Sequence, residues 1–103
     1  MSTTVIHQPR VIWDAARAFV RAAGAPGYHE FASEAHHRLG PEIYEALMDT
    51  HEYLVTEAAR TGGDRTATDL EAGKWRVRLE ELLHARPELT DPVRELTRRG
   101  LEL

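Results

Sequence analysis

Residues 68–89 read TDLEAGKWRVRLEELLHARPEL and carry apolar residues at helical spacing on two sides. Thr68 and Glu71 have the spacing of a capping box, and Pro87, which has no amide hydrogen, is expected to close the helix. The broader stripe comprises Ala72, Trp75, Leu79, Leu82 and Leu83, and the narrower one, roughly opposite, comprises Leu70, Gly73 and Val77. A helix that is apolar on two sides needs neighbours on two sides, so we expect the fold to be organised around this stretch.

Four further helices are predicted, because apolar residues recur at helical spacing and glycine or proline separates the segments. They cover residues 9–23, 28–39, 41–60 and 92–99, and Gly100 is expected to end the last one. The sequence shows no strand-like alternation. It therefore predicts an all-α fold in which residues 1–103 form a single compact bundle of four main helices with a short fifth C-terminal helix. Short connections predict that helices adjacent in sequence are neighbours in space.

The composition limits the classes of protein to consider. With 103 residues, the chain can bury about 65% of its unfolded surface in one core. It has no cysteine, which excludes disulfides and thiolate chemistry and fits a reducing compartment. No apolar run approaches the roughly 20 residues of a membrane span, and the start of the chain lacks the pattern of a secretory signal. We therefore expect a cytoplasmic protein without a membrane partner.

The charge distribution disfavours a nucleic-acid-binding regulator. The net charge is −4 and no basic block occurs, whereas a general nucleic-acid binder presents a basic face. Arginine replaces lysine almost completely, with twelve arginines against Lys74, and alanine occurs fourteen times. This usage is typical of a GC-rich bacterial genome, such as that of an actinobacterium.

Candidate catalytic and metal-binding groups are few. Glu34 and His37 have the Glu-x-x-His spacing of carboxylate metal sites, but the helical wheel points them away from the apolar face, so no metal or cofactor is expected. His51 lies on the apolar arc of the 41–60 helix. It is either a core histidine satisfied by local hydrogen bonds or, together with Tyr44 and an acid from another helix, part of a small catalytic or ligand-binding site.

Residues 68–89 resemble segments of small helical domains from actinobacterial proteins that have no settled activity. The pattern that carries the resemblance is Trp75-x-x-Arg78-Leu79-x-x-Leu82-Leu83-x-x-x-Pro87-Glu88-Leu89. The resemblance implies a helical accessory or interaction domain, and it assigns no functional residue.

The surplus apolar surface favours a non-enzymatic protein-interaction module, self-associating or docking on a protein partner, as an adaptor, regulator or inhibitor of a larger bacterial system. The predicted interface consists of Trp13, Val20, Leu70, Gly73 and Val77. Gly73 supports it, because a glycine inside a helix costs about 1 kcal/mol relative to alanine and is explained where another backbone approaches closely. The alternatives are a small helical enzyme or ligand-binding bundle that uses His51 and Tyr44, and a nucleic-acid-binding regulator. If the last helix and Val5 with Ile6 cover the narrow stripe instead, no interface remains there.

Overall fold

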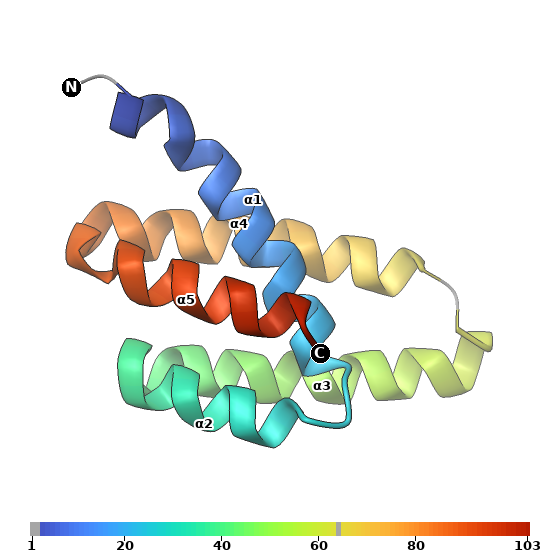
Figure 1. Cartoon of the computed structure of the whole chain (residues 1–103). Helices are drawn as coiled ribbons and strands as arrows, with labels where there is room; N and C mark the ends of the chain where they lie inside the picture. Colours follow the sequence, from blue (N-terminus) through green and yellow to red (C-terminus); the bar gives the residue numbers. More distant parts are fainter. Residues whose placement is uncertain (1–2, 64) are drawn as a thin grey trace.

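The computed structural model describes the backbone of residues 3–63 and 65–103 and the side chains of residues 10–63 and 65–103. Within these residues the chain forms five α-helices and one 3-10 turn, with short connections (Figure 1). The elements are α1 (Thr3–Ala23), α2 (Tyr28–Leu39), α3 (Pro41–Thr61), α4 (Thr66–Ala85), η1 (Pro87–Leu89) and α5 (Thr90–Leu101). The described residues contain no strand, so the predicted all-α bundle is confirmed.

The helix α1, rather than α4, is the one around which the others are arranged. It packs on α4, α5, α3 and α2 and crosses the bundle diagonally in Figure 1. Five of its fully or almost fully buried residues are Ala15, Ala16, Ala18, Ala22 and Ala23. Because alanine adds so little bulk, other helices can approach α1 on several sides, which a stripe of large side chains does not allow. The most extensive contacts of α1 are accordingly with α4 and α5, which are distant in sequence.

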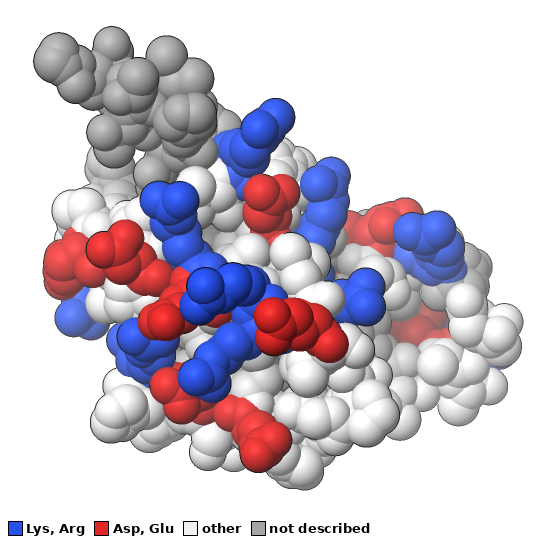
Figure 2. Space-filling view, in the orientation of Figure 1, with Lys and Arg blue, Asp and Glu red and all other residues white. Residues whose placement is uncertain are grey.

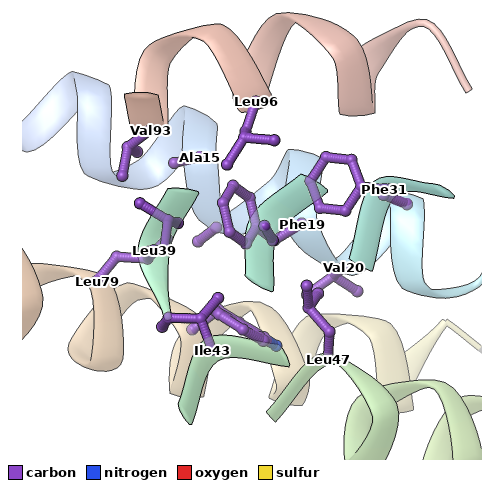
Figure 3. Close-up of a cluster of buried hydrophobic side chains, with 14 of the residues drawn as sticks. Ala15, Phe19, Val20, Phe31, Leu39, Ile43, Leu47, Leu79, Val93 and Leu96 are labelled. Atoms are coloured by element: carbon purple, nitrogen blue, oxygen red, sulfur yellow. The ribbon is translucent and has the colours of Figure 1, made fainter. Parts of the chain in front are cut away.

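A single apolar core lies between α1 and the other four helices. The ring of Phe19 lies 5.1 Å from that of Phe31 and 5.3 Å from that of Trp75, measured between centroids. Figure 3 shows aliphatic side chains from all five helices around Phe19. Trp75, Leu79 and Leu83 are buried here, so the broader stripe of α4 faces the core as predicted.

A chain of polar contacts joins α3 to α4 inside this core. The indole Nε1–H of Trp75 donates to the hydroxyl oxygen of Thr50 at 2.8 Å. That hydroxyl donates to Oε1 of Glu71 at 3.0 Å, and Nζ of Lys74 lies 3.1 Å from Oε2 of the same carboxylate. Both Thr50 and Glu71 are buried. Their mutual bonds matter because a buried polar group left without a partner costs about 1–3 kcal/mol.

Three helices begin earlier than predicted, and one of them is α5, which begins at Thr90 and not at Pro92. α1 begins at Thr3 and not at Pro9, so Pro9 lies beyond the first turn, where its missing amide hydrogen removes one hydrogen bond within the helix. α4 begins at Thr66 and has no side-chain cap. Thr68 and Glu71 therefore form no capping box, because Glu71 faces α3 and its carboxylate is held there.

The C-terminal part of the chain confirms one boundary and corrects another. α4 ends at Ala85, and Arg86 has φ −136° and ψ 75°, an extended conformation that a following proline favours. Pro87 thus closes the helix as predicted. Gly100 does not end α5; it lies inside the helix, where an added Cβ would be 2.7 Å from the carbonyl oxygen of Ala18. Gly100 therefore permits the close packing of α5 on α1.

Candidate interaction surface

The narrow apolar stripe of α4 lies on the outside of the molecule. Leu70 is 55% exposed and Val77 is 44% exposed. Nothing lies within 4 Å of the position that a Cβ on Gly73 would occupy, so Gly73 is not explained by a close backbone contact within the described chain. α5 packs on α1 and α2 and leaves this stripe open. The side chains of Val5 and Ile6 lie outside the described residues.

Trp13 on α1 lies beside this stripe. Its side chain is 39% exposed, and the guanidinium carbons of Arg17 and Arg76 lie 5.3 and 5.5 Å from its ring centroid. Arg76 belongs to α4 and precedes Val77, so it connects Trp13 to the stripe. Contacts of this kind contribute about 0.5–1 kcal/mol at exposed sites, and they restrict where the indole points. We define the α1–α4 surface as Trp13, Leu70, Gly73 and Val77.

Val20 does not belong to the α1–α4 surface, contrary to the prediction. It is 1% exposed and lies beside Leu47 of α3 in the core (Figure 3). The helical wheel placed Val20 and Trp13 on the same flank of their helix. That flank is covered along its C-terminal part, because α1 is surrounded by α3 as well as by α4 and α5.

The exposed side of α1 leads to a cleft where the C-terminal ends of α1 and α3 meet the start of α4. Its volume is about 340 Å³, and among the described residues Arg21 is the one ionisable side chain in its lining. The apolar and small lining residues include Val20, Gly24, Leu54, Val55, Ala58 and Ala67. Val55 and Ala58 are both exposed, because this part of α3 extends beyond the helices that cover its first half (Figure 1).

The ring side chains of the alternative catalytic site hold α2 against α3. The Nδ1–H of His51 donates to the carbonyl of Ala23 at 2.8 Å, and the imidazole stacks on Tyr28 with 3.6 Å between centroids. Tyr44 makes an edge contact of 5.3 Å with His36. His51 is half-buried, and one of its two ring nitrogens is bonded to a backbone carbonyl. It is absent from the lining of the cleft at the end of α1, of the cleft near the end of α5, and of the cleft between the second half of α3 and the start of α4.

The hydrogen bond of His51 has a clear structural role. Ala23 is the last residue of α1, and the final carbonyls of a helix have no partner within the helix. His51 supplies that partner from α3, and Tyr28 at the start of α2 covers the imidazole. These contacts fix the turn between α1 and α2, because the rings of His51 and Tyr28 pack against each other there.

Charged side chains are mixed in sign on the face shown in Figure 2, where acidic and basic groups alternate. Arg38 on α2 lies 2.7 Å from Glu95 on α5. Its hydrogen bond, helped by its positive charge, lowers the pKa of Glu95. His37 is exposed and Glu34 is half-buried at the edge of another cleft, near the end of α5. Among the described residues, no three His, Asp or Glu side chains are grouped to hold a metal ion.

The interaction surface was only partly visible in the sequence. Trp13 and Arg17 are four residues apart on one helix, a spacing that brings side chains together, so their contact was detectable. The contribution of Arg76 and the cleft at the end of α1 depend on how helices cross, which no spacing within one helix reports.

No helix of the described chain combines the length and apolar character that a bilayer crossing requires. No family model matches the chain, and no curated protein or solved structure matches it either.

Proposed function

We propose that this chain is a non-enzymatic protein-interaction module that binds a protein through the α1–α4 surface. Such a module would serve as an adaptor, regulator or inhibitor. The observation that carries the proposal is the open line of Leu70, Gly73 and Val77 on a helix whose other face is fully used by the core. A helix that is apolar on two sides and covered on one leaves the second side for another molecule.

Two further features support the proposal. Trp13 adds a large aromatic side chain beside the line, and tryptophan is among the residues that dominate binding energy at protein interfaces. The side chains with catalytic potential, His51 and Tyr44, are engaged in packing α2 on α3. The hydroxyl of Thr50 does meet the carboxylate of Glu71, but both groups are buried in the core. The outer face of the molecule therefore offers contact area.

The test is the double substitution Leu70→Lys with Val77→Lys. Both side chains are largely exposed, so the helical circular dichroism and the melting temperature should change little. Two charges on the line should abolish binding, because an interface must then bury unpaired ammonium groups. The readouts are the oligomer mass by light scattering and the amount of any specific protein that co-purifies with the chain.

The matched control is Leu101→Lys with Leu103→Lys, which changes two leucines that are 51% and 45% exposed near the turn between α1 and α2. This control should bind like the wild type. If the wild type is a strict monomer that captures no protein, or if both double variants bind equally well, the proposal is wrong. Unfolding of the Leu70 and Val77 variant would show that the stripe is covered within one chain.

A further inference from the structure

The exposed line of α1 is basic. Arg10, Arg17 and Arg21 recur along this line, and Asp14 is the only acid between them in the sequence. All four side chains are exposed. Within the described residues none of the three arginines lies within ion-pair distance of a carboxylate, although Arg17 contacts the indole of Trp13. Three positive charges on this line therefore lack a carboxylate partner among the described residues.

The exposed line of α3 is acidic. It consists of Glu42, Glu45, Asp49 and Glu52, all exposed and spaced so that they lie on one face of the helix. No lysine or arginine occurs between the first and the last of them. Within the described residues none of the four carboxylates makes an ion pair. Four negative charges on a second surface thus also lack ion-pair partners in the part of the chain that the structure describes.

The two lines match in length and spacing. Arg10 and Arg17 are seven residues apart, as are Glu45 and Glu52, which is roughly 10.5 Å along a helix. Arg17 and Arg21 are four residues apart, and Glu42 and Glu45 are three. With α3 laid antiparallel along α1, Glu52 can therefore lie opposite Arg10 and Glu45 opposite Arg17, and Glu42 lies one residue from the position opposite Arg21.

We propose that the partner of the module is a second copy of this chain, whose acidic α3 line docks on the basic α1 line. This inference goes beyond the proposed function, because the contact shares Trp13 with the α1–α4 surface but is otherwise made by the charged lines of α1 and α3. The docked α3 helix lies over Trp13 at one end of the line. Near Arg21 the docked helix reaches the apolar cleft of the copy that receives it, and the lining of that cleft includes Leu54 and Val55. Charge thus sets the register, and the indole and the cleft supply apolar area.

The contact is heterologous, because it joins two different surfaces of identical chains. Such a contact either closes into a ring or continues from copy to copy. Exposed ion pairs are individually weak and screened by salt. The assembly should therefore form at low ionic strength and dissociate when salt is raised, which a purely apolar interface would not do.

The experiment measures the weight-average mass by sedimentation at about 0.01 M and about 1 M salt, where the Debye lengths are about 30 Å and about 3 Å. We expect the wild type to exceed the mass of one chain, 11.7 kDa, at low salt and to return to it at high salt. Arg17→Glu with Arg21→Glu, and separately Glu45→Arg with Asp49→Arg, should each give a monomer at low salt. Far-ultraviolet circular dichroism checks that both variants are folded.

The decisive step mixes these two variants. At positions 17, 21, 45 and 49 the first variant is entirely acidic and the second entirely basic. A mixture therefore restores opposite charges at these positions in both contacts, and its mass should rise again at low salt. A chain that carries all four substitutions should also associate. If a charge-reversed variant does not fold, Arg17→Gln with Arg21→Gln replaces it, with a partial loss of mass expected.

Three results would overturn the inference: a wild type that stays at the mass of one chain, reversal variants that associate like the wild type, or a mixture that stays monomeric. Any of these together with capture of another protein that Leu70→Lys and Val77→Lys abolish would leave the proposed function in place. Loss of both self-association and capture in the wild type would remove the inference and the proposed function together.

Discussion

The two tryptophans show how differently the two sides of the bundle are built. Trp75 is fully buried, contacts Phe19, and donates its indole hydrogen to Thr50. Trp13 is 39% exposed, and the guanidinium groups of Arg17 and Arg76 lie against its ring. Trp75 buries its whole apolar surface in the core, and its one hydrogen-bond donor has a partner there. Trp13 leaves apolar area accessible, which is the property that a docking surface needs.

The two glycines inside helices repeat this contrast. At Gly100 an added Cβ would meet the backbone of Ala18 at 2.7 Å, whereas at Gly73 it would meet nothing within 4 Å. One glycine is required by the crossing of α1 and α5. The other costs helix stability without any return inside the described chain. At Gly100 the neighbouring helix therefore packs directly against the backbone, whereas at Gly73 no other part of the described chain does.

The largest expected effect is the difference in the free energy of unfolding between alanine substitutions of the two tryptophans. Trp75→Ala should destabilise the protein by about 3–5 kcal/mol, because it removes a buried aromatic side chain and leaves a cavity. Trp13→Ala should destabilise the protein by less, about 1–2 kcal/mol, because it loses two cation–π contacts of about 0.5–1 kcal/mol each, and it should weaken binding. Urea unfolding followed by circular dichroism measures both. A large loss at Trp13 would show that the α1–α4 surface is part of the core.

The polar chain inside the core gives the next effect. Thr50→Val should destabilise by about 1–3 kcal/mol, because it leaves the indole hydrogen of Trp75 and one oxygen of Glu71 without a buried partner. Thr56→Val is the matched control on the exposed side of the same helix. It should change the urea midpoint very little. Equal effects at both positions would contradict the assignment of Thr50 as the link between α3 and α4.

The glycines should respond to alanine with opposite signs. Gly73→Ala should stabilise the protein by up to about 1 kcal/mol through helix propensity alone. Gly100→Ala should destabilise it, because overpacking costs about 1–3 kcal/mol and helix propensity counts for little in the last turn of α5. Thermal melting of the two variants side by side measures the difference. Stabilisation by both substitutions would show that α5 can move away from α1 at little cost.

The smallest effect concerns the pair of Arg38 and Glu95 on the surface between α2 and α5. The hydrogen bond and charge of Arg38 lower the pKa of Glu95 from its ordinary value of 4.5. The pair therefore contributes stability above that value, and the contribution is lost as the pH falls through the lowered pKa. Glu95→Gln should melt slightly below the wild type at neutral pH, and the gap should close in acid. Glu81→Gln, an exposed acid without an ion pair in the described chain, should show no such gap.

The sequence by itself determined most of the local structure. Helical spacing of apolar residues located all five helices, and Pro87 located the end of α4. The sequence also identified which stripe of α4 enters the core, because burial of Trp75, Leu79 and Leu83 removes more apolar area from water than burial of Leu70 and Val77 would. These properties depend on residues within one or two turns of each other, so a single helix already contains the information.

Only the tertiary structure decided which helix is central, where Val20 lies, and what each interior glycine does. Alanine is weakly apolar, so its abundance in α1 does not reveal that four helices pack around it. Val20 and Trp13 share a flank of α1 but have different neighbours, because the crossing helices cover one end of that flank and leave the other open. Gly100 and Gly73 look alike in sequence. The distance to another backbone distinguishes them, and that distance is set by how helices cross rather than by any pattern along one of them.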